Sequence, residues 1–116
     1  MARHVVCRVE ELPPGSRRIV PIGRRGIGIF NVNGTYHALH NVCPHAGAPL
    51  CLGRVTGTTV ATAPYQVEWV QEGEILRCPW HGWEFEIASG ETITEPVERV
   101  QTYSIFVEDG QVIIEA

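Results

Sequence analysis

Two short segments of this chain each pair a cysteine with a nearby histidine. The first reads Cys43-Pro44-His45-Ala46-Gly47, and the second reads Cys78-Pro79-Trp80-His81-Gly82. Thiolate and imidazole are the ligands that soft and borderline metals take, and the short spacing lets one loop present both groups to a single metal centre. Proline restricts φ and glycine accepts unusual backbone angles, so both residues suit tight loops. The candidate metal ligands are therefore Cys43, His45, Cys78 and His81.

The segments around these two loops predict a framework made of β-strands. Short apolar stretches rich in Val, Ile, Thr, Tyr and Phe alternate with Gly, Pro and Asn, and no window has a convincing 3.6-residue apolar period. Asn33-Gly34 and Asp109-Gly110 are expected to form tight hairpin turns. The predicted strands are Val5–Glu10, Arg17–Ile22, Ile27–Val32, Tyr36–His40, Val55–Ala63, Gln66–Val70, Ile75–Arg77, Trp83–Ile87, Tyr103–Glu108 and Gln111–Glu115.

Length, charge and hydropathy narrow the class of protein. A chain of 116 residues without repeats or low-complexity tracts has the size of one domain. The formal net charge of −4 and the absence of Lys argue against a nucleic-acid partner, which usually faces a basic surface. No apolar run approaches the roughly 20 residues that a transmembrane helix needs, and the N-terminus has no signal-peptide pattern. We therefore expect a cytoplasmic protein without membrane insertion.

The two loops resemble the signature of Rieske proteins, Cys-x-His-x-Gly-x-x-Leu followed by Cys-x-x-His-Gly. The resemblance extends to the β pattern over nearly the whole chain. It rests on seven matching residues: Cys43, His45, Gly47, Leu50, Cys78, His81 and Gly82.

The resemblance implies a fold and a cofactor. The expected fold is an all-β, Rieske-type antiparallel β-sandwich with a small cluster-binding subdomain made of two loops. One 2Fe-2S cluster is expected per chain, with Cys43 and Cys78 on the inner iron and His45 and His81 on the outer iron. We expect a single Rieske domain over residues 1–116, with the cluster-binding portion at about 41–88. The motifs are farther apart than in most of the family, which indicates an inserted hairpin at about 55–73.

Zinc binding is the main alternative use of these residues. A mononuclear zinc site also takes two cysteines and two histidines, but zinc fingers space them as Cys–Cys and His–His pairs rather than as mixed pairs. Cys7 and Cys51 lie outside the motif. Respiratory Rieske proteins carry a disulfide between their cluster loops, but Cys51 has no partner in the second loop. Cys7 and Cys51 are therefore expected to be free structural residues.

The chain resembles the Rieske ferredoxins and the Rieske domains of aromatic-ring oxygenases more than the high-potential members. Trp83 and Phe85 stand where high-potential members place Ser and Tyr hydroxyls, so a low potential is expected. The resemblance implies an electron-transfer protein without catalytic residues, which carries single electrons between a reductase and an oxygenase. The alternatives are a small electron-transfer or accessory subunit of a larger oxidoreductase, such as a nitrite reductase, and a zinc-binding module. The sequence indicates no particular oligomeric state.

Overall fold

The computed structural model describes residues 2–116, so Met1, the first residue of the single domain expected over 1–116, lies outside the described residues. The described chain forms strands and two short 3₁₀ turns, which confirms the all-β prediction. The strands are β1 (Arg3–Arg8), β2 (Arg17–Val20), β3 (Ile27–Val32), β4 (Thr35–His40), β5 (Arg54–Ala63), β6 (Gln66–Arg77), β7 (Glu84–Glu86), β8 (Thr102–Glu108) and β9 (Gln111–Glu115); the turns are η1 (Val9–Glu11) and η2 (Leu50–Leu52).

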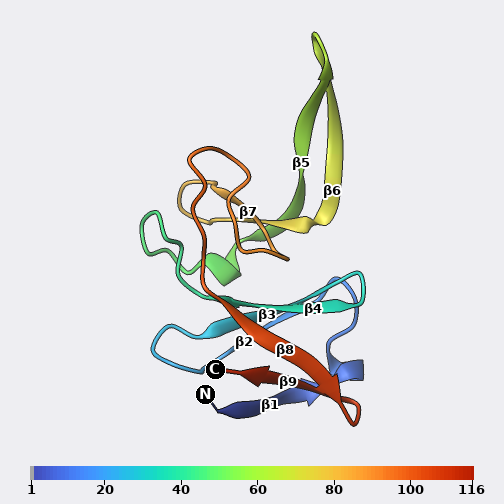
Figure 1. Ribbon diagram of the computed structural model, residues 1–116, viewed down its shortest axis with the longest axis vertical. Coiled ribbons are helices and arrows are strands. Elements are labelled where there is room, and N and C mark those ends of the chain that lie inside the picture. The colour runs from blue at the N-terminus through green and yellow to red at the C-terminus, as the bar shows by residue number, and fades with distance from the viewer. Residues whose placement is uncertain (1) are drawn as a thin grey trace.

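The strands form two antiparallel sheets. The larger sheet has six strands in the order β1-β9-β8-β4-β3-β2, and the smaller has three in the order β5-β6-β7. The halves of the larger sheet join only through β4 and β8, at Ala38↔Tyr103 and Leu39↔Thr102. Figure 1 shows the smaller sheet lying above the larger one, with both chain termini at the far end of the larger sheet.

Both predicted hairpin turns are present. Asn33 and Gly34 have φ angles of 52° and 92°, and Asp109 and Gly110 have φ angles of 52° and 73°. Two consecutive positive φ angles match the twist of paired strands, and Asn-Gly and Asp-Gly accept them at little cost.

The prediction of separate strands over Gln66–Val70 and Ile75–Arg77 is wrong, because β6 runs continuously from Gln66 to Arg77. The residues between the two predicted strands form an irregularity within this strand, where Gln71 and Gly73 have φ angles of 56° and 81°. The pairing with β5 shifts there from Thr56↔Ile75 to Thr58↔Val70. Pairing with β5 on both sides of the irregularity keeps the two segments in one strand.

The buried apolar side chains form two clusters. One fills the space inside the larger sheet and includes Leu12, Ile29 and Ile114. The other joins the larger sheet to the smaller one and includes Leu39 and Phe85; it also contains the cysteines of both predicted ligand loops. The loops therefore rest on the packed interior that joins the two sheets.

The hairpin of β5 and β6 extends well beyond the rest of the protein (Figure 1). Strand β7 pairs with β6 only over Ile75–Arg77, so the remainder of the hairpin is a two-stranded ribbon. The molecule accordingly measures 50 × 28 × 19 Å along its principal axes. Within residues 2–116, no helix has the length and apolar character needed to cross a membrane.

Candidate metal centre

The first predicted ligand loop is closed by two backbone hydrogen bonds. The amide of Cys43 donates to the carbonyl of Ala48 at 2.8 Å, and the amide of Gly47 donates back to the carbonyl of Cys43 at 2.8 Å. Gly47 has a φ of 75°, an angle that a side chain would disfavour. This geometry explains why a glycine lies four residues after the cysteine.

The second loop repeats this backbone frame. The amide of Cys78 donates to the carbonyl of Trp83 at 2.8 Å, and the amide of Gly82 donates to the carbonyl of Cys78 at 3.0 Å. Gly82 has a φ of 71°. The loops are thus equivalent in structure, although the histidine follows its cysteine by two residues in the first loop and by three in the second.

The structure brings the four predicted ligands together as two pairs. The cysteines are buried, with Cys43 0% and Cys78 2% exposed, and the Cys78 side chain is near enough to help raise the pKa of Cys43. The histidines are exposed, and the ring centroids of His45 and His81 lie 4.7 Å apart. A buried thiol pair beneath an exposed imidazole pair fits a binuclear iron–sulfur centre with one soft sulfur end and one histidine end.

The environment of the Cys43 thiol raises its pKa and favours its protonated form when no metal is bound. Burial raises the pKa of Cys43, backbone hydrogen bonds from His45 and Ala46 act in the opposite direction, and the neighbouring Cys78 raises it further. Because metal ligation needs thiolates, loading the site must release protons. Within residues 2–116, no group of three or more His, Cys, Asp or Glu side chains is arranged to hold a single metal ion.

Residues outside the motif also contact the loops. The guanidinium of Arg25 donates to the carbonyl of Gly47 at 2.6 Å. The Asn41 side chain accepts from the Cys51 amide at 2.8 Å and donates to the carbonyl of Arg25 at 3.1 Å. The indole of Trp83 stacks on the imidazole of His45. Sequence reasoning missed Arg25 and Asn41, because nothing in their local sequence shows that the β2–β3 turn lies beside the first loop.

Cys7 and Cys51 are both free and buried, as predicted, and no disulfide forms within residues 2–116. The Cys51 thiol donates to the carbonyl of Leu39 at 3.5 Å. Burial raises the pKa of Cys51 to about 12, although the Gly28 backbone and Arg17 act in the opposite direction. Cys51 also occupies the space beside Gly28, where an added Cβ would lie 2.4 Å from its sulfur. Its role is therefore packing.

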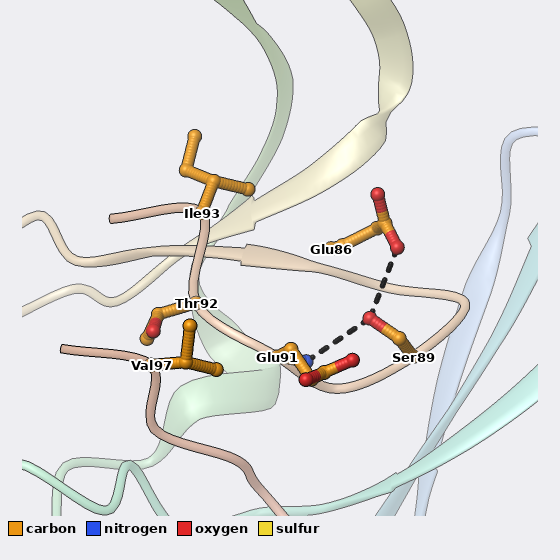
Figure 2. Close-up of a pocket in the computed structure, with 6 residues that line it drawn as sticks. All are labelled: Glu86, Ser89, Glu91, Thr92, Ile93 and Val97. Atoms are coloured by element: carbon orange, nitrogen blue, oxygen red, sulfur yellow. Dashed lines mark hydrogen bonds between the residues drawn. The ribbon is translucent and has the colours of Figure 1, made fainter. Parts of the chain in front are cut away.

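A pocket of about 310 Å³ lies beside β7 and is lined by Glu86, Ser89, Glu91, Thr92, Ile93 and Val97. Figure 2 shows the Ser89 hydroxyl between its two acidic neighbours: it donates to Glu86 at 3.0 Å and accepts from the Glu91 amide at 3.2 Å. The Glu91 carboxylate also pairs with Arg99 at 3.2 Å. None of the four predicted ligands lines this pocket, and its carboxylates already have partners within the protein.

Comparison with known proteins agrees with this arrangement. The family model described as "Rieske [2Fe-2S] domain" matches residues 2–104. The chain is 27% identical over 109 residues to the ferredoxin component of the alkene monooxygenase system of Xanthobacter autotrophicus, covering 94% of this chain and 77% of that protein. It is 32% identical over 112 residues to apoptosis-inducing factor 3 of Mus musculus, but it spans only 16% of that protein's length while 96% of this chain is covered.

Solved structures show the same fold. The Sphingomonas yanoikuyae B1 ferredoxin superposes with a TM-score of 0.71 at 26% identity, covering 99% of each chain. A chain from a complex of reduced oxygenase and oxidized ferredoxin of carbazole 1,9a-dioxygenase superposes with a TM-score of 0.73 at 22% identity, covering 97% of this chain and 91% of that one. At the lower identity, the likeness concerns the fold alone.

Proposed function

The chain belongs to the Rieske [2Fe-2S] domain family, and from this premise we propose that it is a Rieske-type ferredoxin that carries single electrons. The observation that carries the proposal is the convergence of two equivalent loops, which places a buried cysteine pair beneath an exposed histidine pair. A 2Fe-2S cluster, when bound, supplies a one-electron redox couple. We propose one cluster per chain, held by Cys43, Cys78, His45 and His81.

The protein's own residues divide the work at such a centre. Cys43 and Cys78 lie in the interior and keep water from the sulfur end, whereas the exposed rings of His45 and His81 offer the short route to a docked partner. Trp83 shields one face of His45. We propose no catalytic residue, since this chain acts as a carrier rather than as an enzyme.

The partners we propose are a reductase as donor and an oxygenase as acceptor. Relatives over most of this chain's length are ferredoxin components of an alkene monooxygenase system and of a 3-phenylpropionate/cinnamic acid dioxygenase, which supports this assignment. We further propose that the protein works in the cytoplasm. The single domain over 1–116, with its cluster portion at about 41–88 and an inserted hairpin at about 55–73, remains part of this proposal.

One observation favours the alternative of a component within a larger oxidoreductase. The chain spans only 16% of the length of the two apoptosis-inducing factor 3 relatives, which shows that similar segments occur inside much longer proteins. The same electron-carrying role would then be performed within or beside a larger enzyme.

The test is to measure iron, acid-labile sulfide and electron paramagnetic resonance of the purified protein. About two irons and two sulfides per chain, with a Rieske-type spectrum on reduction, are expected. Cys78→Ala and His81→Ala should abolish the spectrum, and Cys51→Ala, which removes a buried thiol outside the site, should retain it. Stoichiometric zinc without sulfide would refute the proposal and support the zinc-binding module.

A further inference from the structure

Glu84 lies at the point where the second ligand loop ends. The loop runs from Cys78 to Trp83, between Arg77, the last residue of β6, and Glu84, the first residue of β7. Arg77 and Glu84 are direct partners across these two antiparallel strands. Because opposed residues of an antiparallel pair project to the same face, their side chains meet at the neck of the loop.

The Glu84 carboxylate accepts hydrogen bonds from two different strands. One oxygen accepts from the Arg77 guanidinium at 2.8 Å, and the other accepts from the Thr58 hydroxyl at 3.1 Å. Thr58 is buried and belongs to β5, which lies on the other side of β6 from β7. The carboxylate therefore fastens the β5–β6 hairpin to both ends of the second ligand loop.

The contacts of Glu84 are more sheltered than an ordinary surface ion pair. The Glu84 side chain is only 21% exposed, whereas both side chains of the Arg3–Glu108 pair are more than half exposed, at 52% and 53%. Exposed ion pairs contribute little to stability, but hydrogen bonds to a charged acceptor are stronger than neutral ones. Removing the carboxylate would also take away the acceptor of the buried Thr58 hydroxyl, which adds a desolvation cost.

The two ligand loops are supported in different ways. In the first loop, the guanidinium of Arg25 donates to the carbonyl of Gly47, within the loop itself. The second loop is held at its neck by a pair of opposite charges, Arg77 and Glu84. Loss of either member would leave an uncompensated charge directly beside the loop.

We propose that Glu84 is a positioning residue of the second ligand loop, and that the Arg77–Glu84 pair balances the charge beside the cluster. By joining the strands at the neck, the carboxylate keeps Cys78 and His81 in place for the cluster. A negative charge near a cluster disfavours its reduced state and a positive charge favours it, so the members of the pair act on the potential in opposite directions. The inference rests on the proposed function, because only a bound cluster has a potential.

Hydrogen exchange, followed by mass spectrometry on the full chain as purified, tests the positioning role. In Glu84→Ala, peptides covering residues 78–83 should exchange at least roughly fivefold faster, because both hydrogen bonds at the neck are lost. Peptides covering residues 43–48 should keep their wild-type rate. Thr58→Val removes one of the two bonds without a change of charge; it should accelerate residues 78–83 to a smaller extent, and it replaces Glu84→Ala if that variant fails to fold.

Glu86→Gln is the matched control for the exchange experiment. Glu86 is the next residue on the same face of β7, one step farther from the loop, and its carboxylate accepts from Gln71 and Ser89 rather than from the neck residues. Its exchange over residues 78–83 should equal that of the wild type.

Protein-film voltammetry of the loaded protein tests the charge balance. Glu84→Gln should raise the potential, Arg77→Gln should lower it, and the double variant should return close to the wild-type value. A purely structural disturbance of the loop would not give shifts of opposite sign. Glu108→Gln removes the same charge from an ion pair of the larger sheet, whose β8–β9 turn lies away from the smaller sheet (Figure 1), and it should leave the potential unchanged.

Each half of the proposal has a result that would overturn it. Exchange over residues 78–83 at the wild-type rate in Glu84→Ala and Thr58→Val, or equal acceleration over residues 43–48, would refute the positioning role. Shifts of the same sign in Glu84→Gln and Arg77→Gln, or an equal shift in Glu108→Gln, would refute the charge balance. A wild-type protein without iron and sulfide would instead refute the proposed function and with it the charge balance, and the exchange comparison would then decide the positioning role by itself.

Discussion

The imidazole of His45 lies nearly flat against the indole of Trp83, with ring centroids 4.1 Å apart and an angle of 15° between the planes. His45 belongs to the first ligand loop and Trp83 closes the second, so this stack ties the loops together. The ring of His81 meets His45 edge-on, at 75°. One histidine of the pair is therefore oriented by a neighbouring aromatic ring as well as by its own loop.

Removing the Trp83 ring should disturb the histidine end of the site. In Trp83→Ala, iron and sulfide content should be retained, but the paramagnetic resonance g values should shift and cluster loss should accelerate. An aromatic stack contributes about 0.5–1.5 kcal/mol, which corresponds to roughly a two- to tenfold change in rate. Trp83→Phe should restore most of the wild-type behaviour. Trp80→Ala removes an exposed indole from the same loop and serves as the control; an unchanged spectrum in Trp83→Ala would show that the stack does not orient His45.

Arg25 should raise the reduction potential through its position beside the first loop. Its guanidinium donates to the Gly47 carbonyl at 2.6 Å, and a positive charge near a cluster favours the reduced state. Arg25→Gln should lower the potential measured by protein-film voltammetry, by an amount on the order of tens of millivolts. Arg25→Lys keeps the positive charge and should leave the reduction potential close to the wild-type value. Arg24→Gln changes the same charge at the adjacent exposed position, and an equal shift there would mean that the loop contact has no special effect.

The potential itself should be low. Trp83 and Phe85 supply no hydroxyl near the cluster loops, so we expect a neutral-pH value toward the negative end of the roughly −150 to +300 mV range of these centres. Phe85→Tyr should raise the potential if its hydroxyl reaches the cluster sulfur. Phe85 is fully buried, so this variant also needs a check of stability, and it is preferable to a Trp83→Ser change that would remove the His45 stack. A wild-type potential well above zero would contradict the tuning argument.

Cys51 should make stability fall in alkaline solution. The pKa of Cys51 in the folded state is raised to about 12, above the unfolded value of about 8.5. The contribution of the thiol to the free energy of unfolding is therefore fully present below pH 8.5 and is lost as pH rises toward 12. The free energy of unfolding of the wild type should therefore decrease over that range more than that of Cys51→Ala. Cys51→Ala should itself lower the free energy of unfolding by about 1 kcal/mol at neutral pH, because it leaves a small cavity.

Alkylation gives an independent check on Cys51. At pH 8 only about one thiol in ten thousand is ionised when the pKa is near 12, so folded protein should react with iodoacetamide far more slowly than unfolded protein. Rapid labelling of Cys51 in the folded state would contradict the packing role.

Much of the fold could be predicted because it depends on local signals. The Asn33-Gly34 and Asp109-Gly110 turns require positive φ angles that few other residue pairs accept, and these turns set the register of their hairpins. By contrast, the single strand β6 was predicted as two. Gln71 adopts a φ of 56° where the pairing of β6 with β5 shifts register, and the residue type does not reveal this.

The sequence by itself determined which residues we propose as ligands of the metal centre, because Cys-x-His and Cys-x-x-His spacings and their glycines are local features of two loops. The tertiary structure alone decided how these residues meet. The buried thiol pair, the His45–Trp83 stack and the Arg25–Gly47 contact each join segments from different parts of the chain. Such contacts arise when the two sheets pack and bring distant loops together, and no local pattern of residues specifies them.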